Sequence, residues 1–231
     1  MKYSKILFTD LDHTMFQASK YFDNYQDTIN CKVASWSDNN RQTPHSFYDN
    51  NQLEIFNKFN TSNNTIIPVT NRSIEKYKRT HISDNAKYAI VSMGSILLIN
   101  NKIDKNWNNI IQSLHLQNSN PIDDLLLFLN DNNIEYVNID NNYIEFKSIS
   151  QENINLLQEY VLNNNILIMY STKKYTSIYP KYINKENTVK YLLDLLIYDK
   201  TYGRGDHKIF DYPFVELMDY QEKIVCKKVE Y

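Results

Sequence analysis

The sequence predicts an α/β fold in which a parallel-sheet core is interrupted by an inserted α+β domain. Short apolar runs that end in polar residues alternate with helical stripes in both terminal parts of the chain, which is typical of a parallel sheet. The middle of the chain instead shows a helix-strand-strand order twice. We therefore expect residues 1–100 and 183–231 to form the core, and residues 101–182 to form the insert.

The first strand is expected at Ile6–Thr9, where a short apolar run is closed by Asp10. The polar and aromatic stretch from about residue 17 to residue 50 has no clear periodicity, and we interpret it as a long excursion, such as a hairpin flap. Apolar residues at helical spacing then predict a helix near 51–60.

Three further strands and a helix follow in the N-terminal part. Residues 66–70 form an apolar run, although Pro68 is unusual for a central strand. Ser73 can cap a helix that extends through about Arg79. A third strand is expected at 88–91, and residues 97–99 follow closely enough to pair with it as a hairpin.

The insert should contain two helices and four strands. Asn120 is suited to cap a helix that has Pro121 at its first position, and Ser150 is suited to cap a second helix. Each helix is followed by two runs of strand-forming residues, and this repeated order suggests an internal duplication. The expected strands are 135–139, 143–147, 166–170 and 175–179.

The C-terminal part returns to the pattern of the first. An apolar stripe predicts a helix over about 186–198, followed by a short strand near Thr201 that leads into Gly203–Asp206. The chain has only three glycines, and Asn is the next residue best able to adopt a positive φ. The three glycines, Gly94, Gly203 and Gly205, are therefore expected to mark positions where Asn does not serve.

Composition limits the classes of function. The 231 residues are 42% hydrophobic with a formal net charge of −2, so a folded protein is expected and neither nucleic acid nor membrane is indicated as a partner. The N-terminal apolar run is too short for a signal peptide or a membrane helix, and we expect a cytoplasmic protein. Cys31 and Cys226 fit neither a zinc motif nor a disulfide framework, which favours reduced thiols.

The strongest chemical signal is the pair Asp10 and Asp12 directly after the first strand. Ligands of open α/β sheets bind at the carboxyl ends of the strands, so Asp10 lies where a site is expected. Two nearby carboxylates repel, and a hard cation such as Mg²⁺ relieves that repulsion through oxygen ligands. One carboxylate could then attack phosphorus while the other serves as acid and base. The competing interpretation is a turn with two solvated aspartates.

Three weaker signals follow the first. Thr70 ends the second strand just before a helix, where a hydroxyl can donate to a phosphate oxygen. Lys185 precedes a helix and could neutralise a phosphoryl group, although lysines at helix starts are usually solvated. Asp206 and Asp211 follow Gly205, which would allow the backbone to approach a ligand. They could complete a magnesium shell or simply form an acidic loop.

In their order along the chain, Asp10, Asp12 and Thr14, then Thr70, Lys185, and Asp206 with Asp211 resemble the four motifs of the haloacid dehalogenase-like superfamily. The insert resembles the α+β cap of the class that includes sucrose-phosphate phosphatases and Cof-like proteins. The resemblance implies a Rossmann-like core, with Asp10 as nucleophile and Asp12 as general acid and base. It also implies phosphate binding by Thr70, Asn71 and Lys185. The implied Mg²⁺ ligands are Asp10, the Asp12 backbone carbonyl, Asp206 and Asp211.

Three positions depart from that pattern. The family often has Gly where this chain has His13 and where it has Asn71, and Asn is a good substitute where φ is positive. The family usually places four steps between its last two acidic residues, whereas Asp206 and Asp211 are five apart. His13 and His207 would lie near the site, and we interpret both as ordinary loop residues rather than substrate ligands.

The resemblance implies a magnesium-dependent phosphomonoester hydrolase that forms an aspartyl-phosphate. Its substrate would be a small phosphorylated metabolite, with a sugar phosphate as the preferred candidate and a nucleotide or phospholipid-headgroup ester as the alternatives. One alternative is a degenerate, non-catalytic binding protein of the same fold, which the altered Asp206–Asp211 spacing motivates. Another is a phosphate-receiving signalling domain, but such domains are about half this length and lack the insert.

Overall fold

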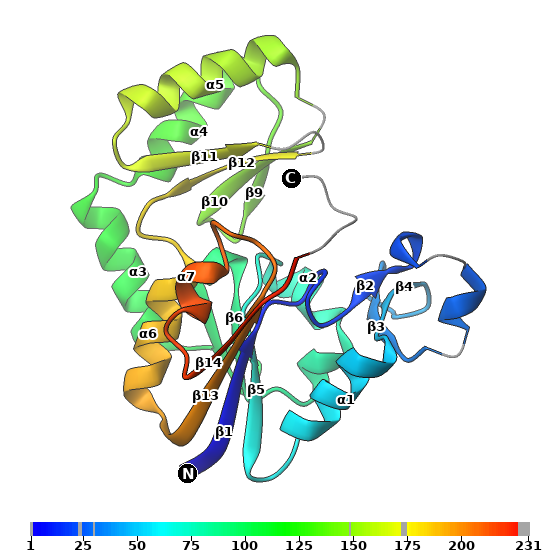
Figure 1. The fold of residues 1–231 in the computed structure, drawn as a ribbon. Coiled ribbons are helices and arrows are strands. Elements are labelled where there is room, and N and C mark those ends of the chain that lie inside the picture. Colours follow the sequence, from blue (N-terminus) through cyan, green and yellow to red (C-terminus); the bar gives the residue numbers. More distant parts are fainter. Residues whose placement is uncertain (1, 23–24, 30, 148, 172–174, 226–231) are drawn as a thin grey trace. The chain divides into compact units, whose positions relative to one another are not determined.

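A computed structural model describes residues 2–22, 25–29, 31–147, 149–171 and 175–225 of the chain (Figure 1). The chain divides into two compact units. Of the described residues, the first contains those up to Asp104 together with 184–225, and the second contains those of Lys105–Ile183. The expected insert was 101–182. Cys226 lies outside the described residues, and Cys31 is a free thiol.

A parallel sheet forms the centre of the first unit. It consists of β1 (Lys2–Thr9), β5 (Asn64–Pro68), β13 (Ile197–Gly205) and β14 (Tyr220–Lys223), in the order β14-β13-β1-β5. Phe8 pairs with Gly203 on one side and with Ile67 on the other. The carboxyl ends of β1, β5 and β13 therefore lie side by side, which is where the sequence places its polar residues.

A three-stranded antiparallel sheet continues from β5. It consists of β6 (Tyr88–Val91), β7 (Ile96–Ile99) and β8 (Lys102–Ile103). The expected 88–91 and 97–99 hairpin is confirmed, with Val91 opposite Ile96. A parallel bridge joins Val69 to Ile90, so β6 extends the parallel sheet beyond β5.

Helices lie against the sheet of the first unit (Figure 1). They are α1 (Asn50–Phe59), α2 (Ile74–Lys78), α6 (Lys185–Leu195) and α7 (Tyr212–Val215). Phe56 and Phe59 of α1 pack with Leu7 and Ile66 in the hydrophobic core. Asp49 and Gln52 form a capping box that fixes the start of α1. Ser73 caps α2 as predicted, through a hydrogen bond from the Lys76 N–H.

The excursion after β1 contains a small sheet with the order β2-β4-β3. Its strands are β2 (Gln17–Ala18), β3 (Val33–Trp36) and β4 (Pro44–Phe47), and its 3-10 turns are η1 (Ser19–Tyr21) and η2 (Tyr25–Thr28). The β3–β4 hairpin is fixed to α2 and to the 3-10 turn η3 (His81–Asp84). Arg41 donates to both oxygens of Asp84 at 2.8 Å, and Arg79 donates to the Ser37 carbonyl at 2.8 Å.

The second unit is a four-stranded antiparallel sheet with helices. Its helices are α3 (Lys105–Gln117), α4 (Pro121–Asp131) and α5 (Gln151–Asn163). Its strands are β9 (Val137–Ile139), β10 (Tyr143–Lys147), β11 (Leu167–Ser171) and β12 (Tyr175–Pro180), in the order β11-β12-β10-β9. The predicted helix-strand-strand order thus occurs twice, as α4-β9-β10 and α5-β11-β12.

Three sequence expectations about these elements were incomplete or wrong. Helix α3 was missed because its sequence is rich in Asn and only Trp107, Ile111 and His115 are buried, one per turn. Asn120 does not cap α4 with its side chain. Its backbone is left-handed (φ 49°), and its N–H closes the turn after α3 by donating to the His115 carbonyl at 2.8 Å.

The helix predicted over 186–198 ends at Leu195, and β13 begins at Ile197. Leu196 continues the helical apolar spacing, but its backbone is extended. Pairing of Tyr198 with Tyr3 of β1 decides the conformation here, because the sheet gains hydrogen bonds along its whole length. The strand expected near Thr201 is therefore longer than predicted.

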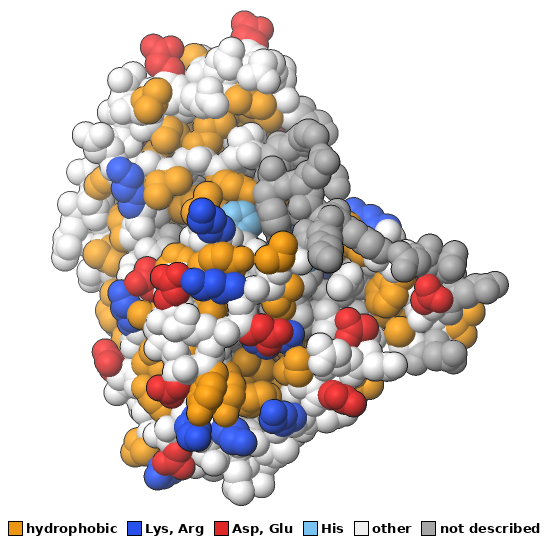
Figure 2. Space-filling model, in the orientation of Figure 1, with side chains coloured by type: hydrophobic (Ala, Val, Ile, Leu, Met, Phe, Trp, Pro, Cys, Tyr) orange, Lys and Arg blue, Asp and Glu red, His pale blue; other side chains and the backbone are white. Residues whose placement is uncertain are grey.

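The visible surface carries charged side chains of both signs. Acidic and basic side chains are interspersed over the described part of the face in Figure 2. Among the described residues, no helix has both the length and the apolar content needed to cross a membrane.

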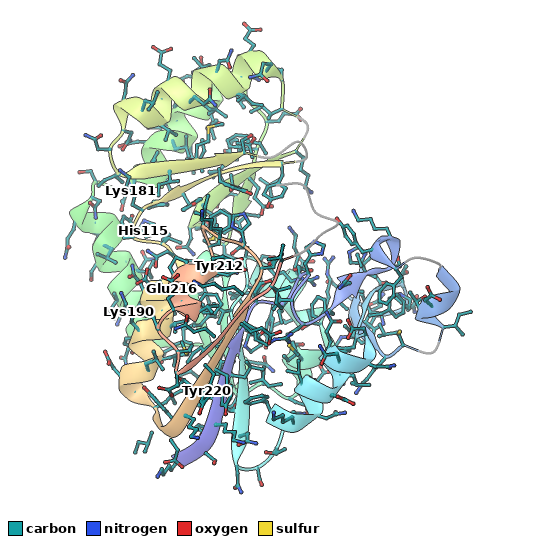
Figure 3. All side chains as sticks on the ribbon, viewed as in Figure 1. His115, Lys181, Lys190, Tyr212, Glu216 and Tyr220 are labelled. Carbon is teal, nitrogen blue, oxygen red and sulfur yellow. The ribbon has the colours of Figure 1, made fainter. Side chains whose placement is uncertain are left out.

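Within the second unit, buried His115 (Figure 3) contacts the Tyr182 hydroxyl at 2.8 Å and the Asn142 side chain at 3.2 Å. This buried polar cluster joins α3 to the β9–β10 turn and to the end of the unit.

Candidate active site

Three carboxylates meet at the carboxyl end of the parallel sheet. Asp10 directly follows β1, and its N–H donates to the Arg204 carbonyl at 2.9 Å, which continues the pairing with β13. Asp206 directly follows β13. One oxygen each from Asp10, Asp206 and Asp211 lie within 4.8 Å of one another, and all three residues are buried. The structure thus brings together acidic residues that are about 200 positions apart in the sequence.

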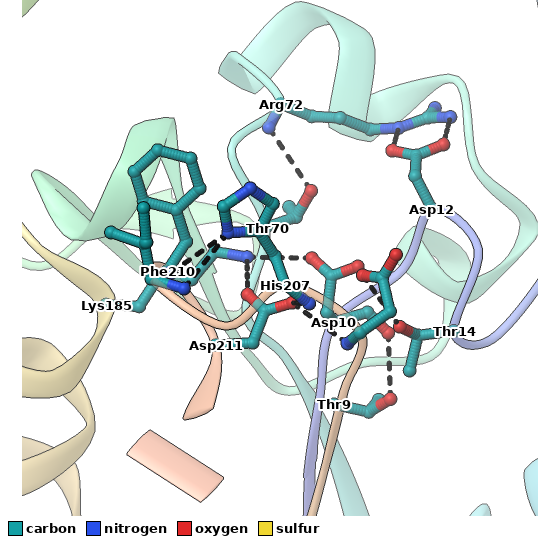
Figure 4. A network of polar contacts seen from close by, with 12 residues as sticks. Thr9, Asp10, Asp12, Thr14, Thr70, Arg72, Lys185, His207, Phe210 and Asp211 are labelled. Atoms are coloured by element: carbon teal, nitrogen blue, oxygen red, sulfur yellow. Dashed lines mark hydrogen bonds and ion pairs between the residues drawn. The ribbon is translucent and has the colours of Figure 1, made fainter. Parts of the chain in front are cut away.

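Lys185 lies between two of these carboxylates (Figure 4). Its Nζ is 2.7 Å from Asp10 Oδ1 and 2.6 Å from Asp211 Oδ1. Lys185 is the first residue of α6, and Asn184 caps this helix by accepting from the Asn187 N–H at 2.9 Å. The side chain of Lys185 is only 2% exposed, so the interpretation as a solvated lysine does not hold.

Asp211 uses both of its carboxylate oxygens. While Oδ1 accepts from Lys185, Oδ2 accepts from the backbone N–H groups of Asp206 at 3.2 Å and His207 at 3.0 Å. The Asp211 N–H also donates to the His207 carbonyl at 2.8 Å, which closes the loop. The five-residue spacing therefore keeps Asp211 beside the other carboxylates.

Gly205 makes this close approach possible. A Cβ atom at Gly205 would lie 2.3 Å from Asp211 Cβ. We expected the missing side chain to admit a ligand, but it admits the Asp211 side chain instead. A Cβ at Gly94 or at Gly203 would likewise lie within 3 Å of a neighbouring atom, at 2.3 Å and 2.8 Å respectively. All three glycines thus occupy positions without room for a side chain, so Asn could not replace them without a shift of the neighbouring atoms.

The electrostatics of the cluster favour a bound cation. Burial raises the pKa of Asp10 well above its usual value; Lys185 opposes this, while Asp211, Asp206 and Asp12 add to it. Burial lowers the pKa of Lys185, but the charges of Asp10 and Asp211 outweigh this effect and raise it. Three buried carboxylates face one ammonium group. Oxygen ligands with excess negative charge are what a hard divalent cation requires, so this donor set fits Mg²⁺.

Asp12 is paired with Arg72 rather than with the carboxylate cluster. Arg72 donates to Asp12 through Nε at 2.8 Å and through Nη2 at 2.7 Å, and its guanidinium lies 5.2 Å from the centre of the Phe16 ring. Burial would raise the pKa of the Asp12 carboxyl, but the charge and hydrogen bonds of Arg72 hold it below its usual value. Asp12 is therefore ionised at neutral pH in this form. From the sequence alone, Arg72 could contact a substrate anion or form a surface salt bridge, and the structure places it in a salt bridge with Asp12.

Two hydroxyl groups line the site. Thr70 is buried after the end of β5, and its Oγ1 accepts from the Arg72 N–H at 3.2 Å, which leaves the hydroxyl hydrogen available for a ligand. Thr14 donates to Asp206 Oδ1 at 3.4 Å. Asn71 is half-buried between Thr70 and Arg72 on the same loop.

A turn of three residues with left-handed backbone fixes the position of the Thr70–Arg72 loop relative to α6. Ser92, Met93 and Gly94 all have positive φ (51°, 63° and 94°), which is costly for the first two. The Ser92 N–H donates to the Arg72 carbonyl at 2.8 Å, and the Met93 N–H to the Thr70 carbonyl at 3.3 Å. Thr188 of α6 donates to the Gly94 carbonyl at 2.5 Å. The sequence showed no signal for this turn apart from Gly94.

The positive φ expected near Asn71 occurs elsewhere. Asn71 is absent from the positive-φ residues, whereas His13 has φ 64°. The expectation for Asn71 was therefore wrong, and His13 adopts the conformation that glycine favours. Its ring meets the ring of Tyr21 edge to face at 4.7 Å. His207 accepts at Nδ1 from the Ile209 and Phe210 N–H groups and thus orders its own loop.

Comparisons with known proteins show similarity in structure alone. No family model matches the chain, and no curated protein matches its sequence. A hypothetical protein from Geobacillus kaustophilus HTA426 is similar with a TM-score of 0.50 and 11% identity, over 94% of this chain and 84% of that one. At this identity the similarity concerns the fold, which the two chains share.

Two other solved structures have slightly lower scores. The sucrose-phosphatase of Synechocystis sp. PCC6803, in complex with sucrose and phosphate, has a TM-score of 0.49 and 15% identity, over 84% of this chain and 70% of that one. A phosphatase of the haloalkanoate (HAD) enzyme superfamily from Bacteroides thetaiotaomicron has a TM-score of 0.48 and 10% identity, over 94% and 82%.

Proposed function

We propose that this chain is a magnesium-dependent phosphomonoester hydrolase that works through an aspartyl-phosphate on Asp10. The observation that carries the proposal is the convergence of Asp10, Lys185 and Asp206 at the carboxyl end of the sheet. Phosphoryl transfer needs a nucleophile, a cationic clamp and metal-binding carboxylates, and the site contains groups suited to each. The order of these residues in the sequence supports the same conclusion.

In the first half of the reaction, an Asp10 oxygen attacks phosphorus and the bond from phosphorus to the leaving oxygen breaks. Asp12 is ionised while it is paired with Arg72, so it first takes up a proton and separates from Arg72, and the leaving oxygen then takes that proton. Lys185 neutralises the charge on the phosphoryl oxygens, while the Thr70 hydroxyl and the Asn71 loop hold them by hydrogen bonds. In the second half, water attacks the phosphoryl group, Asp12 takes the proton of that water, and the bond from Asp10 to phosphorus breaks.

The Mg²⁺ would be held by Asp10, the Asp12 backbone carbonyl and Asp206, with Asp211 in support. When bound, the ion neutralises the phosphoryl group and suppresses repulsion between that group and the attacking carboxylate. Thr14, through its hydrogen bond to Asp206, orients one of these ligands. Asp211 has both oxygens engaged by Lys185 and by the loop backbone, so we assign it to positioning those groups.

We propose the second unit as the substrate-recognition cap. Helices α4 and α5 cover the sheet face that carries Ile144, Phe146 and Ile178. Because side chains alternate along strands, the opposite face carries Glu145, Ser177 and Tyr170, which lie in one cross-strand row. Tyr143 and Tyr179 share that face. Tyr143, Ser177 and Tyr179 are buried, whereas Glu145 and Tyr170 are half-buried. A carboxylate beside a phenol suits a polyol such as a sugar, so a sugar phosphate is the preferred substrate class.

A phosphatase screen tests this function. We expect release of phosphate from p-nitrophenyl phosphate and from sugar phosphates with Mg²⁺, and no release with EDTA. Asp10→Asn should lower the rate by at least about 1,000-fold, because the nucleophile is lost. Asp194→Asn makes the same chemical change at an exposed position of α6 and should leave the rate unchanged. Absence of turnover in the wild-type protein, with binding of phosphate esters retained, would instead favour the non-catalytic alternative.

A further inference from the structure

We propose that a cavity on the α1 side of the parallel sheet binds a small aromatic carboxylate. The cavity has a volume of about 270 Å³ and lies within the first unit, between α1 and the strands β13 and β14. None of the residues that line it belongs to the group assigned to phosphoryl transfer. The inference therefore goes beyond the proposed function and does not depend on it.

The cavity lies beside the part of the sheet that α1 covers. Helix α1 packs on β1 and β5, whereas β14 forms the edge of the sheet and its four residues are exposed. On β13, Tyr202 and Arg204 line the cavity. A Cβ at Gly203, between them, would point the other way, to 3.0 Å from Val215 at the end of α7. The cavity and α7 are therefore on opposite faces of β13.

Aromatic and aliphatic side chains form most of the cavity wall. The rings of Tyr202 and Tyr220 stack at 4.6 Å with 11° between their planes, and the ring of Phe59 meets that of Tyr202 edge to face at 5.1 Å. Leu7 and Ile55 complete the apolar part. Tyr220 is 47% exposed, so this wall is partly open to solvent. A flat apolar ring that packs on it would bury surface on both sides.

The wall also contains a buried guanidinium with donors to spare. The Arg204 side chain is only 6% exposed, and a guanidinium carries five N–H groups. Glu222 accepts from Nε at 2.7 Å and from Nη2 at 3.2 Å, and Met15 Sδ, a weak acceptor, lies 3.5 Å from Nη1. Two N–H groups, one on each Nη, therefore have no acceptor among the described residues. Burial of a donor without an acceptor is costly, and the two oxygens of a ligand carboxylate could accept from both.

The charges of the lining favour an anion. Arg204 and Lys58 are cationic and Glu222 is the one acidic residue of the lining, so two positive charges face one negative charge. Lys58 is exposed, and its Nζ lies 5.9 Å from the ring centre of Phe59, which places this charge beside the aromatic wall. A ligand with one negative charge would balance the lining, whereas an amine would add a third positive charge. An aromatic ring with a carboxylate satisfies both the wall and the charges.

Three indole probes with the same ring and a two-carbon side chain test the class of ligand. Indole-3-acetate ends in a carboxylate, tryptophol in a hydroxyl and tryptamine in an ammonium group. We expect equilibrium dialysis with the full-length protein to show saturable binding of one equivalent of indole-3-acetate. Its affinity should be at least about tenfold higher than that of tryptophol, because charge-assisted hydrogen bonds are lost with the hydroxyl, and tryptamine should bind more weakly still. Absence of saturable binding of indole-3-acetate, or equal affinity for the three probes, would overturn the proposal.

Two charge variants locate the bound probe. Arg204→Lys keeps the charge but removes the planar array of donors, and it should weaken binding of indole-3-acetate by about tenfold or more. Lys58→Gln should weaken it by a few-fold and leave the affinity for tryptophol unchanged. Lys102→Gln makes the same chemical change at an exposed position outside the cavity, and it should leave both affinities unchanged.

One further variant does not depend on the buried arginine. Tyr220→Leu replaces a partly exposed ring of the wall, and we expect it to weaken binding of both indole-3-acetate and tryptophol by a few-fold. Thermal unfolding shows which variants are folded, and an unfolded Arg204→Lys leaves Lys58→Gln and Tyr220→Leu to decide. If these two variants keep the wild-type affinity for indole-3-acetate, the probe binds elsewhere and the assignment of the cavity is wrong.

Discussion

Burial of the Asp10 carboxylate among other acidic groups carries an electrostatic cost. The carboxylate is buried and has three other carboxylates as neighbours, with Lys185 as the compensating charge. A group whose pKa is raised by folding stabilises the folded state only while it is protonated. Its contribution is present below the unfolded pKa of about 3.9 and is lost as the pH rises through the folded value. At neutral pH, without a metal ion, the ionised Asp10 carboxylate therefore destabilises the folded state.

The Asp10→Asn variant should consequently be more stable than the wild-type protein in the absence of metal. We expect a rise in Tm of about 2–4 °C or more at pH 7, since about 1 kcal/mol corresponds to such a shift in a chain of this size. Lys185 keeps Asp211 as its partner, so the substitution leaves no unpaired charge. The difference should shrink toward pH 4, where the wild-type carboxyl is protonated. Calorimetry with EDTA measures both, and a lower Tm for the variant at pH 7 contradicts the account.

A second prediction at this scale concerns Gly205. The added methyl group of Gly205→Ala would collide with Asp211 and should cost about 1–3 kcal/mol by overpacking. Because it also displaces the partner of Lys185, we expect a large loss of kcat. Gly203→Ala is the matched control, since its Cβ would meet Val215 and Met218 and no site carboxylate. It should lose stability with much less effect on kcat; equal losses of kcat in the two variants would argue against a specific role of Gly205. Urea unfolding and steady-state kinetics give both quantities.

At the scale of elements, the start of α6 joins the helix to the chemistry. Asn184 caps the helix, Lys185 is its first residue, and Thr188 is bonded to the left-handed turn at 92–94. The Asn184 carbonyl oxygen also lies only 2.3 Å from the position that a Cβ atom at Gly94 would occupy. Small movements of this first turn would therefore move the ammonium group relative to Asp10.

Removing the cap tests this coupling. Asn184→Ala should cost about 1 kcal/mol, as is usual for a lost N-cap, and should lower kcat several-fold because Lys185 is less well held. Ser150→Ala removes the equivalent cap of α5 in the second unit, where the Ser150 side chain accepts from the Asn153 N–H at 3.2 Å. We expect a similar loss of stability with kcat retained. If both variants keep full kcat, α6 does not position Lys185 in the way proposed.

Most elements could be predicted because their periodicity matches their burial. Local patterns predicted β10 at its exact bounds and the cap Ser73. They failed where tertiary contacts decide the backbone, as at Leu196, which sheet pairing draws out of the helix, and at Asn120, which a tight turn makes left-handed. For the site, order along the chain indicated the charged residues, but no local pattern reveals a pair such as Asp12 and Arg72, which are 60 positions apart.

At the scale of the whole molecule, the chain is built so that two distant parts of the sequence form one unit and the intervening segment forms another. In the sequence, β13 comes after the residues of the second unit, and it completes the sheet of the first unit. Its pairing with β1 brings Asp206 beside Asp10. The site therefore exists only when the two parts of the first unit are joined, so ligand binding to it should stabilise that unit as a whole.

Magnesium should accordingly stabilise the protein. We expect Mg²⁺ to raise Tm by several degrees at concentrations well above its Kd, because a ligand at about 100 times its Kd contributes about 2.7 kcal/mol. EDTA should reverse the shift, and Asp206→Asn should reduce it. The Ser150→Ala variant, altered only in the second unit, should show the full shift. A shift of equal size in Asp206→Asn would place the ion elsewhere.

The most direct measurement of the central claim is a crystal structure of the protein with Mg²⁺ and beryllium fluoride, which mimics a phosphoryl group on a carboxylate. We expect the fluoride adduct on the Asp10 side chain, in contact with Lys185 and Thr70. An ion with oxygen ligands at about 2.1 Å should lie between Asp10 and Asp206. An adduct or an ion bound away from Asp10, or a site that remains empty at saturating concentrations of both, would contradict the proposed chemistry.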